Sequence, residues 1–163
     1  MQTVGKLVFF CGKMGAGKST YAKQLADQHR AVLISEDEWL AVLYPQQIAS
    51  FEDYLRYSAL LKKLIKPHVQ HILRSGADVV MDYPANTRKQ RAWFKQLLSE
   101  VKASHQLIYL KADDDLCLSR IAQRAIEQPQ RAAFDKPEVF HHVTQYFEVP
   151  NSDEGLCVET KST

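Results

Sequence analysis

Short apolar runs alternate along this chain with longer stretches in which apolar and polar residues repeat at helical spacing. The apolar runs cover residues 6–11, 31–34, 79–82, 107–110 and 156–159. Short, nearly continuous apolar runs are typical of strands buried on both faces of a parallel sheet. The pattern therefore predicts five β-strands.

The stretches between these runs have apolar residues on one helical face. Helices are predicted over residues 20–29, 36–43, 54–73, 88–101 and 138–147, and a further helix follows the Asp113-Asp114-Asp115 cluster and runs to about residue 127. Ser35 with Glu38 and Thr87 with Gln90 have the spacing of capping boxes, and Pro67 is expected to kink or divide the longest helix. Strands alternating with helices in this way predict a parallel α/β sheet that binds ligands at the carboxyl ends of its strands.

Length and composition indicate one ordinary globular domain covering residues 1–163. The net charge of +2 gives no reason to expect nucleic acid or an anionic membrane as a partner. Cys11, Cys117 and Cys157 lie in apolar or strand-like surroundings, and we expect them to be buried free thiols. No apolar stretch is long enough to span a bilayer and no signal peptide precedes the first strand, so a cytoplasmic location is expected.

The first predicted strand runs directly into a glycine-rich motif and a helix, the context required of a phosphate-binding loop, or Walker A motif. The residues that we expect to bind nucleotide there are Gly12, Lys13, Met14, Gly15, Ala16, Gly17, Lys18, Ser19 and Thr20. Glycines allow the backbone N–H groups to surround a polyphosphate, and the helix aims its positive end at the same anion. Lys18 is expected between the β- and γ-phosphates and Ser19 on Mg²⁺. The competing interpretation is a glycine-rich turn with a solvent-exposed lysine.

Polar residues that follow the other strands are expected to meet at the same edge of the sheet. Asp37 follows the second strand, where it could accept the proton of an attacking hydroxyl, or could only complement a helix dipole with Glu36 and Glu38. Asp82 ends the third strand, where it could orient substrate, hold a Mg²⁺-bound water or simply terminate the strand. Arg88 is either a ligand for an anionic substrate or a solvated residue of a helix's first turn.

Three arginines follow the fourth strand. Arg120 and Arg124 are one helical turn apart and could clamp phosphates or stack on a base, and Arg131 lies in a polar segment at about residues 127–137. If this segment is a lid, its closure would exclude water and bring Arg131 to the transferring phosphoryl group. The alternative is an ordinary solvated basic face. The histidines show no metal-ligand spacing, so no metal site other than the Mg²⁺ site is expected.

With these motifs together, the chain resembles small P-loop kinases near the polynucleotide 5′-kinases, zeta-toxin-like kinases and AAA-type ATP-binding kinases. The resemblance implies a three-layer fold with strand order 2-3-1-4-5, helices on both faces and an arginine-bearing lid over ATP. It also implies that Asp37 is the catalytic aspartate, that Arg124 is the lid-helix arginine on the phosphates, and that Asp82 and Arg88 lie on the substrate side. Phage-type polynucleotide kinases carry an arginine shortly after the catalytic aspartate, where this chain has Trp39 and Leu40. This departure disfavours nucleic-acid substrates.

We therefore expect an ATP- and Mg²⁺-dependent kinase that phosphorylates a hydroxyl of a small molecule, with Lys18, Asp37 and Arg124 as catalytic residues. A helical segment at about residues 44–75, including Arg56, is expected to line the acceptor site, although its aromatic residues equally suit core packing. Two alternatives remain open. One is a polynucleotide or nucleoside 5′-hydroxyl kinase, and the other is a nucleotide-binding ATPase switch that acts through a protein partner.

Overall fold

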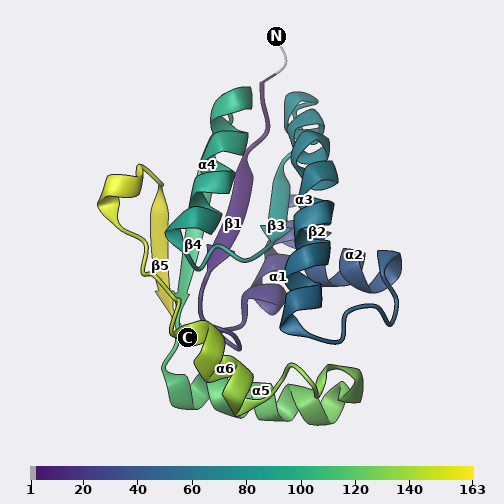
Figure 1. Ribbon diagram of the computed structural model, residues 1–163. Helices are drawn as coiled ribbons and strands as arrows, with labels where there is room; N and C mark the ends of the chain where they lie inside the picture. The colour runs from purple at the N-terminus through teal and green to yellow at the C-terminus, as the bar shows by residue number, and fades with distance from the viewer. Residues whose placement is uncertain (1–2) are drawn as a thin grey trace.

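The computed structural model describes residues 3–163 and contains a five-stranded, all-parallel sheet. The strands are β1 (Leu7–Cys11), β2 (Val32–Ser35), β3 (Val79–Asp82), β4 (His105–Lys111) and β5 (Val158–Ser162), and their order is β2-β3-β1-β4-β5 (Figure 1). The predicted strand order and α/β architecture are confirmed.

Helices cover both faces of this sheet. They are α1 (Lys18–His29), α2 (Glu36–Leu43), α3 (Phe51–Arg74), α4 (Arg88–Val101), α5 (Asp114–Glu127) and α6 (Pro137–Thr144), with short 3₁₀ helices η1 (Pro129–Arg131) and η2 (Ser152–Glu154). Thr87 and Gln90 form the predicted capping box of α4. At α2 the Ser35 hydroxyl accepts a bond from the Glu38 amide at 3.4 Å, which caps the helix from one side.

The central strand β1 separates two apolar layers because its side chains alternate between the faces of the sheet. Leu7 and Phe9 face α3 and α4, and Phe9 stacks on Phe94 with ring centroids 4.3 Å apart. Phe10 belongs to the opposite layer with α1, α5 and α6, where Ala22 and Phe140 are fully buried. This double burial is why β1 reads as a continuous apolar run and why the loop after it starts from a rigid base.

Several local expectations are wrong. Pro67 lies inside α3 and does not divide the long helix, so the expected division is wrong and the expected kink stays a prediction. A proline removes one backbone hydrogen bond, and the burial of Ile65 and Val69 on either side holds the helix against the sheet. Cys157 is exposed because β5 is an edge strand that begins one residue later. Leu55 is one of the apolar residues of the long helix predicted over residues 54–73, yet its side chain is exposed.

None of the helices in residues 3–163 combines the length and the apolarity needed to cross a membrane.

Candidate active site

The glycine-rich loop connects β1 to α1 at the carboxyl edge of the sheet. Gly15 and Gly17 have positive φ angles of 83° and 101°, a conformation that side chains disfavour. A Cβ atom on Gly15 would also lie 2.6 Å from the Cys117 carbonyl oxygen of α5. Gly17 begins α1 with no side-chain cap, so the N–H groups of the first turn are left for an external anion.

The Lys18 ammonium lies in the concave side of this loop. It donates hydrogen bonds to the carbonyl oxygens of Gly12 and Lys13, the latter at 3.1 Å. Burial lowers the pKa of Lys18, and the negative charge of Asp82 acts in the opposite direction. A lysine held in this way is directed at the loop's own ligand position, which contradicts the interpretation of a solvent-exposed lysine.

Ser19 lies on the first turn of α1, and its hydroxyl is close enough to the Asp82 carboxylate to affect its pKa. Asp82 ends β3, where it pairs in register with Ser35 of β2. Burial raises the pKa of Asp82, while the nearby Ser19 hydroxyl and the Lys18 ammonium lower it. A hydroxyl and a carboxylate side by side are the oxygen donors that Mg²⁺ uses when phosphates and water supply its remaining ligands.

Asp37 lies on the first turn of α2 and contacts the segment predicted to be a lid. Its Oδ2 is 3.4 Å from Nη1 of Arg131, and its side chain is 58% exposed. The aspartate is also close enough to Asp82 for its charge to raise the pKa of that residue. Asp37 thus contacts Arg131 and lies close enough to Asp82 for the two charges to interact.

Arg124 and Arg131 are joined by Asp135, a buried carboxylate that sequence reasoning missed. Asp135 accepts from Arg124 Nε at 3.0 Å and Nη2 at 2.6 Å, and from Arg131 Nε at 3.2 Å. Its side chain is fully buried. The bidentate contact orients the Arg124 guanidinium, and Arg131 bridges Asp135 and Asp37.

Arg120 contacts the outer side of the phosphate loop. Its Nη1 donates to the carbonyl oxygens of Gly15 at 3.4 Å and Ala16 at 3.0 Å, and it reaches the Thr163 hydroxyl at 3.3 Å. In this arrangement the side chain binds backbone of the loop, and its expected contact with nucleotide stays a prediction.

The remaining predicted arginines lie away from these groups. Arg88 forms a two-point ion pair with Asp153, with both N–O distances 3.0 Å. Arg56 is exposed on α3, with its guanidinium 5.4 Å from the centre of the Tyr57 ring. Within residues 3–163 neither side chain contacts Asp37, Asp82 or the loop, and their substrate roles stay predictions.

Glu36, the residue before Asp37, is a buried carboxylate. Glu36 accepts hydrogen bonds from the hydroxyls of Tyr54 and Ser58, the latter at 2.7 Å. Burial raises the pKa of Glu36 against the effect of these two donors. The contacts attach the first turn of α2 to α3. Sequence reasoning treated Glu36 only as a complement to the helix dipole, because nothing in the local pattern indicates that Tyr54 and Ser58 lie next to it.

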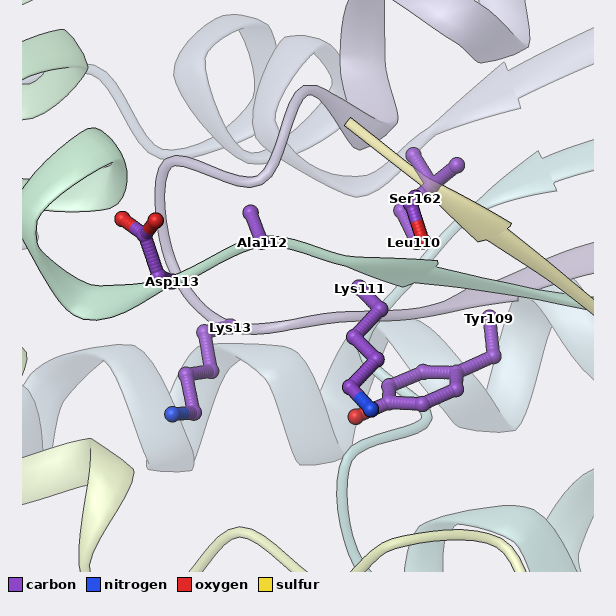
Figure 2. Close-up of a pocket in the computed structure, with 7 residues that line it drawn as sticks. All are labelled: Lys13, Tyr109, Leu110, Lys111, Ala112, Asp113 and Ser162. Atoms are coloured by element: carbon purple, nitrogen blue, oxygen red, sulfur yellow. The ribbon is translucent and has the colours of Figure 1, made fainter.

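A cavity of about 400 Å³ lies on the other side of the loop, at the carboxyl ends of β4 and β5. In Figure 2 the Lys13, Lys111 and Tyr109 side chains extend to one side of the β4 ribbon, away from Asp113 and Ser162. Lys13 is held by Asp114 at 2.7 Å. Of the residues that line this cavity, Lys13 alone was predicted from the sequence to bind nucleotide. The cavity is lined by Lys13, Tyr109, Leu110, Lys111, Ala112, Asp113 and Ser162.

Comparison with known proteins shows which fold and which family this chain shares. The chain is similar to a candidate kinase from Chloroflexus aurantiacus J-10-fl, with 22% identity, a TM-score of 0.79 and coverage of 100% of this chain and 87% of the other. It is similar to a sugar kinase from Janibacter sp. HTCC2649, with 15% identity, a TM-score of 0.65 and coverage of 97% and 85%. The Mycobacterium tuberculosis APS kinase CysC, in complex with AMPPNP and APS, gives 18% identity, a TM-score of 0.63 and coverage of 97% and 89%.

No curated protein sequence matches the chain. At these identities the solved structures show a shared fold, that of P-loop kinases. A family model described as an AAA domain matches residues 7–150. The matched range includes the phosphate loop and the residues Asp37, Asp82, Arg120, Arg124 and Arg131. The chain therefore belongs to the AAA domain family and has its P-loop kinase-like fold.

Proposed function

We propose that this protein is an ATP-dependent kinase that transfers the γ-phosphate to a hydroxyl of a small molecule. The observation that supports the proposal is the contact of Asp37 with Arg131 at 3.4 Å, together with the influence of its charge on Asp82 at the end of β3. This arrangement has the parts that phosphoryl transfer needs, namely a phosphate cradle, cations for the developing charge and a carboxylate for the attacking hydroxyl.

The loop and its cations would hold the triphosphate. Backbone N–H groups at the start of α1 would bind phosphate oxygens, and Lys18 would exchange its contacts with the loop carbonyls for the β- and γ-phosphates. Arg124 and Arg131 each have guanidinium nitrogens beyond those bound by Asp135, and we assign these to the transferring group. Their positive charge would stabilise the transition state.

Ser19 and Asp82 are the residues that would hold Mg²⁺, Ser19 directly and Asp82 through a water. Their proximity is what supports this assignment. A bound Mg²⁺ neutralises charge on the phosphate oxygens as the γ-phosphoryl group is transferred.

Asp37 would orient the acceptor hydroxyl and accept its proton. In the structure Nη1 of Arg131 lies 3.4 Å from Oδ2 of Asp37, so binding of a terminal phosphate by Arg131 would leave Asp37 available to the acceptor. The similarity to a sugar kinase and to an APS kinase bound to AMPPNP and APS supports a small acceptor. The identity of that acceptor is left to the experiment.

The test is a radiolabelled-phosphate transfer screen over nucleosides, sugars, antibiotics and 5′-hydroxyl oligonucleotides, with wild type and Asp37→Asn. The variant should lose transfer by about 10²–10⁴-fold and still bind AMPPNP, because Asp37 acts on the acceptor proton. Glu38→Gln is the matched control, because it removes a charge at the next residue, whose side chain is 62% exposed. It should transfer phosphate at the wild-type rate.

Each other result contradicts a defined part of the proposal. Transfer to oligonucleotides alone would replace the small acceptor with nucleic acid. ATP hydrolysis that persists in Asp37→Asn, with no acceptor phosphorylated by wild type, would favour the ATPase switch. Failure of the wild type to bind AMPPNP would refute the nucleotide site itself.

A further inference from the structure

Both backbone polar groups of Gly12, the first residue of the phosphate loop, are bound by side chains. The Gly12 amide donates to Oδ1 of Asn86 at 2.9 Å, and the Gly12 carbonyl oxygen accepts from Lys18. Lys18 is expected to leave this carbonyl when it binds phosphate, whereas Asn86 has no such reason to move. Asn86 is therefore the side chain that can hold the start of the loop in both states.

Asn86 is itself fixed at its backbone. It lies between β3 and α4, where its amide donates to Gln90 Oε1 at 2.8 Å and its carbonyl oxygen accepts from the Glu148 amide at 2.9 Å. The orientation of its side chain is also determined, because a backbone N–H can bond only to the amide oxygen. The two Nδ2 protons then lie on the opposite edge of the amide from the Gly12 contact.

Arg91 packs against the loop that carries Asn86 and is 0% exposed. Arg91 Nη1 donates to the carbonyl oxygen of Ala85 at 3.0 Å and lies 3.9 Å from Sγ of Cys11, the last residue of β1. Its charge is compensated by Glu154 of η2, whose Oε1 is 2.8 Å from Arg91 Nε. Arg91 thus contacts both residues that immediately precede the bonded pair, Cys11 before Gly12 and Ala85 before Asn86.

A buried ion pair is weak evidence for stability, because removing two charges from water costs about as much as their attraction returns. Arg91 also leaves its Nη2 without a hydrogen-bond partner within residues 3–163, an additional cost. An apolar residue would fill this space at lower cost if packing were its only role. The residue does, however, fix the relative positions of β1 and the loop after β3.

We propose that Asn86 is a positioning residue of the nucleotide site, which holds the Gly12 peptide in the conformation that binds phosphate, and that the Arg91–Glu154 pair supports it. The inference rests on the proposed nucleotide site and adds to it a group from outside the glycine-rich motif. It also links the acceptor side of the crevice, where β3 ends, to the phosphate loop.

The first experiment measures amide hydrogen exchange at Gly12 by NMR in the nucleotide-free protein, comparing wild type, Asn86→Ala and Gln96→Ala. Gln96 is an exposed residue of α4 and serves as the matched control for truncating an amide side chain. Exchange at Gly12 should be about tenfold faster in Asn86→Ala, as expected for loss of one hydrogen bond, and unchanged in Gln96→Ala. Unchanged exchange in Asn86→Ala overturns the proposal whether or not the protein is a kinase.

The second experiment measures AMPPNP affinity by calorimetry in the presence of Mg²⁺. Asn86→Ala should bind about tenfold more weakly than wild type. Asn86→Asp keeps an oxygen for the Gly12 amide, so exchange at Gly12 should return to the wild-type rate. Its new charge beside the triphosphate should nevertheless lower affinity. A merely structural role would not produce this separation, and wild-type affinity in both variants would refute a role in nucleotide binding.

The support by Arg91 needs a variant that leaves no buried charge unpaired. The double variant Arg91→Met, Glu154→Gln removes both charges together, so it avoids the large penalty of breaking one side of a buried pair. It should fold and show faster exchange at Gly12 in the same direction as Asn86→Ala. If Gly12 exchange is unchanged in the folded double variant, the supporting role is refuted. If the double variant does not fold, Arg91→Lys is used instead. Lysine keeps the positive charge but has a single nitrogen, so it cannot make all the contacts of the guanidinium. A wild-type rate of Gly12 exchange in Arg91→Lys would also refute the supporting role of Arg91.

Discussion

Asp135 provides the strongest test of how Arg124 and Arg131 are held. The variant Asp135→Asn keeps the shape of the side chain and one oxygen acceptor but removes the charge between Arg124 and Arg131. In the structure this carboxylate is fully buried, whereas the two arginine side chains are 30% and 29% exposed. The substitution therefore leaves the arginines partly solvated and removes their common partner.

The magnitude follows from the three contacts at 3.0, 2.6 and 3.2 Å. A hydrogen bond to a charged group contributes about 1.5–3 kcal/mol, and partial solvation of the arginines favours the lower end. Asparagine keeps part of this interaction, so we expect a loss of about 2–3 kcal/mol in the free energy of unfolding. For a domain of this size, that corresponds to a decrease in Tm of about 4–12 °C.

The assay combines thermal unfolding by circular dichroism with phosphate transfer to the acceptor found in the screen. Asp27→Asn, the same change at an exposed aspartate of α1, is the control and should shift Tm by about 1–2 °C or less. Transfer should fall at least about tenfold in Asp135→Asn at temperatures where the variant is folded, because misplaced arginines stabilise the transition state less. If Asp135→Asn melts with the control and transfers phosphate at the wild-type rate, the reasoning is wrong.

Three further predictions concern the reactivity of the thiols, the pH dependence of stability and the exposed ion pair of Arg88 with Asp153. In the native protein at pH 8, Cys157 should react rapidly with DTNB, because it is exposed. Cys11 should react only after unfolding, because burial blocks access to it and raises its pKa to about 11. Rapid reaction of more than one thiol per native chain would contradict this burial. Burial raises the pKa of Glu36 above its ordinary value of 4.5, so the folded state binds this proton more tightly than the unfolded state. The contribution of this proton to the free energy of unfolding should therefore decline as the pH rises above about 4.5. Denaturant titrations at several pH values should find this decline in the wild type and not in Glu36→Gln. Arg88→Ala and Asp153→Ala should each leave the free energy of unfolding close to its wild-type value, as expected of an exposed pair. A rise in the acceptor's KM in Arg88→Ala alone would show that Arg88 also binds substrate.

The strand order and the phosphate loop could be predicted from sequence because both depend on local patterns. The burial of β1 on two faces is recorded directly in its apolar residues, and the alternation of strands and helices leaves few ways to connect a parallel sheet. The glycines with positive φ and the lysine that follows them are part of one short motif. For the same reason the capping box at Thr87 was predictable.

What only the tertiary structure decided is which charged side chains meet. Asn86 lies 74 residues from the Gly12 amide that it holds, and Arg91 lies 63 residues from Glu154. Arg88 and Arg91 look alike in the sequence, yet one is paired at the surface and the other is fully buried. Backbone conformation is set mainly by near neighbours and by periodic burial, whereas the partner of a charge depends on how distant segments pack. For this reason the phosphate loop could be predicted from the sequence, whereas Asn86, which binds the loop, and Asp135, which binds Arg124 and Arg131, could not.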